Sequence, residues 1–131
     1  MPKASKEHTD KVVDVPPAED RSSDLDGYTA NFVTIKLTHD LAPMLASLPG
    51  GNCSCPHWGY VFQGKLIVRY DDREEVLEAG DAFYMAPGHA PEAEAGTEFV
   101  MFSPTDELEA TNAAIMAGMA GMAGMAATHD G

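Results

Sequence analysis

Basic residues are scarce in this chain, which has 8 Lys and Arg against 21 Asp and Glu over 131 residues, a formal net charge of −13. Such an excess of negative charge repels nucleic-acid phosphates and anionic lipid surfaces. We therefore expect neither a nucleic-acid nor a membrane partner. The chain also lacks an apolar run long enough for a membrane-spanning helix or a secretory signal, so the expected compartment is the cytoplasm.

Cysteine is equally scarce, with only Cys53 and Cys55, one residue apart. A disulfide between them would close a very small loop and strain the bond. Reduced thiols, or thiolates on a metal ion, are expected instead. The length of the chain allows one domain with a core of its own, but not two.

Apolar residues are few in the first 27 positions, where Asp, Glu, Lys, Ser and Pro predominate. Such a segment buries too little apolar surface to offset the entropy lost on ordering. We predict that residues 1–27 form a flexible, disordered acidic arm. One alternative stays open, because Val12, Val13 and Val15 could add an edge strand to a sheet or pair with a second subunit.

From Tyr28 to Ser103, short β-branched and aromatic runs alternate with tight turns. Strands this short and turns this frequent are typical of an antiparallel sandwich or small barrel. We predict an all-β domain over residues 28–103, with one or two helical turns over 40–48. The predicted strands are 28–37, 57–63, 65–70, 74–78, 82–86 and 97–102.

A helix is predicted after this domain, from Pro104 to about Met116. Ser103 is a suitable N-cap, proline is favourable in the first turn, and two acidic residues follow near the positive end of the helix dipole. Beyond this helix a Met-Ala-Gly unit repeats, and each glycine costs a helix about 1 kcal/mol relative to alanine. Residues 104–131 are thus expected to be a helix followed by a fraying Met/Ala/Gly-rich tail.

Potential metal ligands gather at Cys53, Cys55 and His57, with His89 as a fourth from a distant strand. Alternate residues of an extended chain share a face, so the first three could point into one pocket. Thiolates and imidazoles suit tetrahedral zinc, with iron(II) or copper as alternatives. The alternative without a metal is a pair of small buried thiols beside a hydrogen-bonded core histidine.

Residues 57–63 alternate in character, with Trp58, Tyr60 and Phe62 on one face. If His57 points into the domain, these three aromatic side chains point outward. We expect them to pack against the N-terminal arm, the terminal helix or another subunit.

Two motifs resemble those of the cupin superfamily. The segment Tyr60-Val61-Phe62-Gln63-Gly64 is similar to the hairpin of the first cupin motif, and Gly80-Asp81 with Ala86-Pro87-Gly88 is similar to the frame of the second. The resemblance implies a small single-domain antiparallel jelly-roll barrel over residues 28–103, a divalent metal ion inside it, and a homodimer.

The residues at the family's metal positions differ from the usual ones. Cupins commonly bind metal through three histidines and one glutamate. Counted from the hairpin glycine, two of the histidine positions fall on Gly51 and Cys53, and the glutamate position falls on His57. The last histidine position falls on Pro91, two residues after His89. The resemblance therefore implies a rebuilt metal site.

Two functions remain open from the sequence. In the first, a divalent transition metal and a small polar metabolite share the barrel, and metal-assisted chemistry acts on the metabolite. In the second, the barrel binds or senses a small molecule without catalysis, and any metal is structural. Four bound ligands would close the metal shell, whereas the loss of Cys53 or Cys55 from it leaves an open position.

Overall fold

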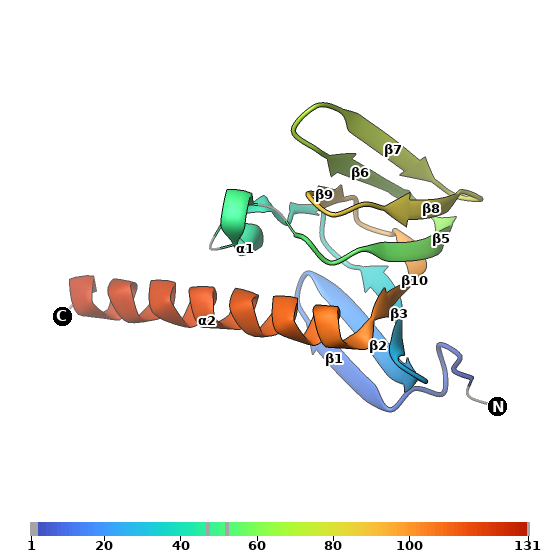
Figure 1. Cartoon of the computed structure of the whole chain (residues 1–131), viewed down its shortest axis with the longest axis horizontal. Helices are drawn as coiled ribbons and strands as arrows, with labels where there is room; N and C mark the ends of the chain where they lie inside the picture. Colours follow the sequence, from blue (N-terminus) through green and yellow to red (C-terminus); the bar gives the residue numbers. More distant parts are fainter. Residues whose placement is uncertain (1–2, 47, 52, 131) are drawn as a thin grey trace.

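The computed structural model describes residues 3–46, 48–51 and 53–130, and these residues form two β-sheets and a long C-terminal helix (Figure 1). The elements in chain order are β1 (Lys11–Val15), β2 (Ala18–Leu25), β3 (Tyr28–Ile35), β4 (His39–Asp40), α1 (Ala42–Leu45), the 3-10 turn η1 (Pro49–Gly51), β5 (His57–Gln63), β6 (Lys65–Arg69), β7 (Glu74–Glu78), β8 (Ala82–Met85), β9 (Ala90–Ala93), β10 (Glu98–Pro104) and α2 (Thr105–Asp130).

Both sheets are antiparallel. One has the strand order β1-β2-β3-β10-β5-β8, and the other has the order β4-β9-β6-β7. Alternate side chains of the two inner faces form a shared core, and the predicted jelly-roll barrel is confirmed. The buried residues of this core are Val33, Ile35, Val61, Leu66, Val68, Leu77, Phe83, Met85, Ala93 and Phe99.

The flexible arm predicted for residues 1–27 is wrong for residues 11–25, which form β1 and β2. β2 pairs with β3 along its whole length, and β1 pairs with β2 as the edge strand. Main-chain hydrogen bonds between the strands hold this segment in place. On the outer face, Arg21 and Glu19 form an ion pair, so these charged side chains remain compatible with a strand. The edge strand that the valines left open as an alternative is therefore what the structure contains.

The C-terminal helix begins one residue later than expected and continues beyond Met116 to Asp130. Ser103 is not its N-cap but lies inside β10. Early in α2, Leu108 and Ile115 pack on a second apolar cluster with Leu45 of α1. Beyond this contact α2 extends away from the strands (Figure 1). No proline interrupts the alanines and methionines of the repeat, which are strong helix formers.

Within the described residues, no helix combines the length and the apolar character needed to cross a membrane.

Candidate metal centre

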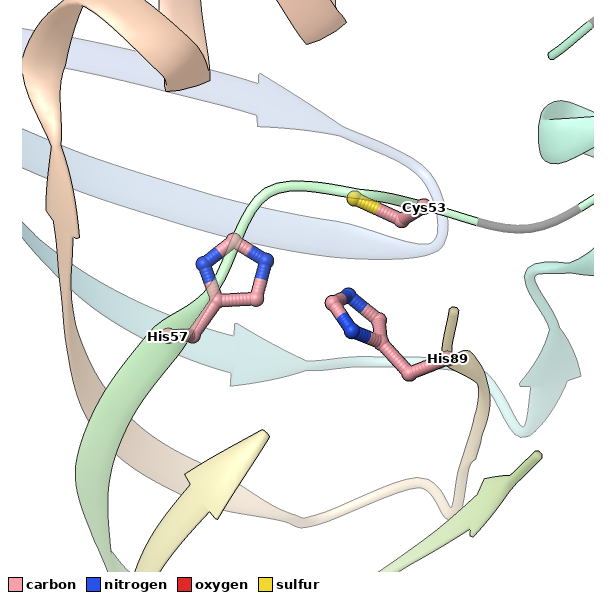
Figure 2. Close-up of side chains that lie close together, drawn as sticks. All are labelled: Cys53, His57 and His89. Carbon is pink, nitrogen blue, oxygen red and sulfur yellow. The ribbon is translucent and has the colours of Figure 1, made fainter. Parts of the chain in front are cut away.

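Cys53, His57 and His89 converge in the structure, with the thiol and the two rings close together (Figure 2). One ligand atom from each residue, a sulfur or a ring nitrogen, lies within 4.8 Å of the others. His57 is the first residue of β5, whereas Cys53 and His89 lie outside the strands and are joined by an antiparallel bridge. All three are buried. The structure thus brings together three of the four predicted ligands, which we call the triad.

Backbone hydrogen bonds fix Cys53 against His89. The Cys53 amide donates to the His89 carbonyl at 2.9 Å, and the His89 amide donates back at 3.3 Å. The Gly88 amide donates to the same Cys53 carbonyl at 2.8 Å. The φ of Gly88 is 95°, in the left-handed region that glycine adopts without strain. The Pro-Gly turn of the second motif therefore positions two of the triad residues.

Each imidazole is oriented by a hydrogen bond at Nδ1. His89 Nδ1 lies 2.6 Å from the Ala86 carbonyl oxygen. That oxygen can only accept, so Nδ1 carries the proton and Nε2 keeps its lone pair. His57 Nδ1 lies 2.6 Å from Ser103 Oγ, and both residues are buried. Bonds of this kind hold metal-ligating histidines in place, with Nε2 as the remaining ligand atom.

Burial sets the charge state of the triad. Together with the nearby His89 ring, it lowers the pKa of His57 to about 3. It also lowers the pKa of His89, against the opposing effect of the bond to Ala86, and it raises the pKa of the Cys53 thiol. At neutral pH both rings are uncharged and can donate lone pairs. The thiol gives up its proton only when a cation stabilises the thiolate.

The triad forms part of the wall of a cavity of about 330 Å³. Both sheets and the first turns of α2 contribute the rest of the wall, and most of it is apolar. This volume is in the range of small-molecule sites in proteins. Apolar wall residues include Val33, Leu66, Met85, Phe99, Leu108 and Ile115.

No protein-family model matches this chain, and no curated protein matches it in sequence. Solved structures are similar to it in three dimensions. A RmlC-like cupin from Shewanella frigidimarina NCIMB 400 superposes with a TM-score of 0.53 at 19% identity, covering 77% of this chain and 88% of its own. The chain has a cupin fold. KdgF from Halomonas sp. gives a TM-score of 0.51 at 22% identity, covering 72% of this chain and 86% of its own.

The chain is also similar in three dimensions to a structure of lower sequence identity, the iron(II) form of HppE, with a TM-score of 0.54 at 9% identity. The match covers 79% of this chain and 60% of HppE. Identities this low establish the architecture and carry no activity from one protein to the other.

The resemblance of the sequence motifs aligns two of the triad residues with positions where cupins commonly have metal ligands. Cys53 stands at a histidine position and His57 at the glutamate position. Pro91 stands at the last histidine position, and its side chain lines the cavity without a donor atom. His89, two residues earlier, lines the same cavity and supplies an imidazole. Three candidate donors, one thiol and two imidazoles, therefore meet at one part of the cavity wall.

The structure does not bring Cys55 into the triad. The chain bends at Cys55, and the strand begins only at His57, so the alternation that would place all three side chains on one face is interrupted. The Cys55 thiol lies 3.6 Å from the Pro56 carbonyl and packs in the cluster with Leu108. Burial, with the charges of Cys53 and Glu107, raises the pKa of Cys55 to about 12.

Four further polar residues lie on the cavity wall, and none had a role in the sequence analysis: Asp20, His39, Thr111 and Asn112. Asp20 lies on β2, within the segment predicted as a flexible arm. His39 lies on the two-residue strand β4, and its Nδ1 is 2.7 Å from the Leu37 carbonyl. Strand alternation in residues 18–25 would have placed Asp20 on the same face as Ala18, but composition alone hid that pattern.

Proposed function

We propose that this cupin-fold protein binds one divalent transition metal ion through Cys53, His57 and His89 and holds a small molecule beside it in the cavity. The observation that carries the proposal is the convergence of three buried donors within 4.8 Å on the wall of that cavity. Structural histidines and cysteines that merely fill a core do not need their ligand atoms turned toward one another.

The donor set fits a transition metal. One thiolate and two imidazoles suit zinc first, with iron(II) or copper as alternatives, whereas magnesium and calcium require oxygen donors. Three protein ligands leave one position of a tetrahedral shell open, as in catalytic zinc sites. The closed, purely structural shell would need Cys55 as a fourth ligand, and its thiol is not among the converging ligand atoms.

When bound, a divalent ion supplies a Lewis acid that polarises a ligand carbonyl or hydroxyl group. The chain contributes the rest. Ala86 and Ser103 hold the two rings by hydrogen bonds to Nδ1, and the Cys53 thiolate balances one positive charge. A ligand that covers the apolar wall would displace water from it, and this would strengthen electrostatic interactions near the site. These features support metal-assisted chemistry on a bound molecule, with binding or sensing without catalysis as the second candidate.

The apolar character of the cavity wall changes the class of ligand that we propose. The sequence indicated a small polar metabolite. A mainly apolar wall favours instead a molecule with one polar, metal-binding end and an apolar body.

A homodimer is part of the proposal. Trp58, Tyr60 and Phe62 lie on the outer face of the larger sheet and are 42%, 41% and 53% exposed. By strand register, Tyr84 and Phe102 lie on either side of Trp58 on that face. An exposed aromatic surface of this kind favours a protein partner, and a second copy of the chain is the simplest. The lack of nucleic-acid or membrane partners stays a prediction from charge, and the cytoplasmic location stays a prediction from the lack of a long apolar run.

Elemental analysis of the purified protein tests the metal proposal. After loading with zinc, iron(II) or copper(II) and removal of excess, we expect about one ion per chain. Cys53→Ser and His89→Ala should each retain less than about one-tenth of that amount. His39→Ala and Cys55→Ser are matched controls, because both residues lie outside the triad, and should load like the wild type. Empty wild-type protein under all three conditions would refute the proposal.

A further inference from the structure

Asp20 places a carboxylate on the wall of a cavity that is otherwise mainly apolar. It lies on the inner face of β2, opposite Val13 on β1 and Val33 on β3. Among the described residues, no Lys, Arg or His side chain lies within ion-pair distance of it. Lys11, on the same face of β1, acts on the charge of Asp20 without forming an ion pair. An unpaired acid beside apolar surface is costly unless something binds it.

Asn31 holds Asp20 in place and carries an unmet acceptor of its own. Its Nδ2 donates to Asp20 Oδ1 at 2.9 Å, from the neighbouring strand β3. Asn31 Oδ1, in the same amide group, is buried and has no hydrogen-bond partner among the described residues. A buried polar atom without a partner is destabilising, because it has lost its hydrogen bonds to water. One carboxylate oxygen of Asp20 therefore accepts from Asn31, whereas Asn31 Oδ1 lacks a donor among the described residues.

We propose that Asp20, held by Asn31, is the subsite that binds the donor end of the ligand, an ammonium or hydroxyl group on a mainly apolar body. The carboxylate accepts the hydrogen bond, and the surrounding wall of Val13, Val33 and Phe99 covers the apolar part. The proposal rests on the proposed function for the metal-binding end of the ligand. The donor end requires no metal.

A purely structural role predicts different behaviour. If Asp20 serves only to tie β2 to β3 through Asn31, an amide of the same size at position 20 preserves that bond, and ligand selectivity should not depend on the charge. If Asp20 receives a ligand donor, loss of the charge weakens binding of an ammonium while leaving the apolar contacts unchanged.

Three small probes of similar length separate these cases. Hexan-1-ol and 1-methoxypentane are isomers that differ in whether they carry a donor, and 1-hexylamine is an ammonium ion at pH 7. Binding is measured on the purified full-length protein by NMR titration, with the Asn31 side-chain amide as the local reporter. We expect 1-hexylamine to bind at least about tenfold more tightly than 1-methoxypentane, which corresponds to about 1.4 kcal/mol, with hexan-1-ol in between.

The charge variant is Asp20→Asn, and the matched control is Asp14→Asn, an exposed acid on β1 that pairs with Lys36. Asp20→Asn should remove most of the preference for 1-hexylamine and leave 1-methoxypentane binding within about twofold, while Asp14→Asn changes neither. Equal binding of the three probes to the wild type, or a preference that survives Asp20→Asn, would overturn the proposal. All three probes are titrated into protein stripped of metal with a chelator, so these outcomes do not depend on whether the triad binds an ion.

Discussion

At the scale of single residues, the proposed metal centre depends on donors and on the groups that orient them. The sequence indicated Cys53, His57 and His89 because of residue type and spacing, and the structure places these three together. Cys55 shows the limit of spacing, because alternation holds only in an extended chain and the chain bends there. Ser103 could not be recognised, since its link to His57 joins strands that are distant in sequence.

Ser103→Ala removes the hydrogen bond that orients His57. Loss of such an outer contact commonly weakens metal binding about 10–100-fold, and we expect a change of that size in zinc affinity, measured by competition with a chelator. Ser23→Ala is the matched control, because Ser23 is also a buried serine but bonds the Asp10 amide, away from the triad. Equal affinity of both variants would show that Ser103 does not support the site.

Zinc binding should release about one proton from Cys53 at pH 7. Burial raises the pKa of this thiol, so it is protonated before the metal binds, whereas His57 and His89 are already neutral because burial lowers their pKa values. The apparent affinity for zinc should therefore rise about tenfold per pH unit near neutrality. Calorimetry in buffers of different ionisation enthalpy measures the proton count. A heat that is the same in all buffers would contradict this assignment.

At the scale of elements, strands with strong alternation were predictable and short or polar ones were not. The strand predicted at 57–63 matches β5, and the one at 74–78 matches β7. β9 has only four residues, one of them proline, and β2 is mostly polar. Neither sequence therefore shows the alternating apolar pattern that predicts a strand. Both are held in place by hydrogen bonds to neighbouring strands. This pairing depends on residues elsewhere in the chain, so the local sequence does not predict it.

The hairpin glycine, Gly64, packs closely against Thr97, and a substitution there tests this contact. Its φ is 84°, and an added Cβ would lie 2.4 Å from Thr97 Oγ1 and 2.5 Å from the Thr97 Cα. The backbone atom cannot move aside cheaply, so Gly64→Ala should lower the free energy of unfolding by at least about 2 kcal/mol more than Gly80→Ala. Gly80 is the control, with a φ of 94° and open space around its Cα. Urea unfolding gives both values, and equal losses would refute the close contact.

At the scale of the whole molecule, the cupin fold has a cavity inside and an exposed aromatic face outside. The net charge of −13 keeps such molecules apart in general, so a dimer needs a specific apolar contact. The outward direction of Trp58, Tyr60 and Phe62 follows from sequence alternation alone and is confirmed. The partner that binds this aromatic face could not be predicted, because the alternation of residues in a strand shows only which side chains point outward.

Trp58→Glu should convert a homodimer into a monomer, because it buries a charge in the apolar centre of the proposed interface. Sedimentation equilibrium measures the mass, which should fall from two chains to one. Val76→Glu is the control, since Val76 is 46% exposed on β7 of the other sheet and should leave the mass unchanged. A wild type that sediments as one chain at all concentrations would contradict the dimer.

Zinc K-edge X-ray absorption of the loaded protein tests the metal centre most directly, because it counts the ligands by element. We predict one sulfur at about 2.3 Å and two imidazole nitrogens at about 2.0–2.1 Å, with one further light atom at the open position. Cys55→Ser should leave this spectrum unchanged. Two sulfurs in the wild type would show that Cys55 closes the shell, and a shell without sulfur would contradict the site itself.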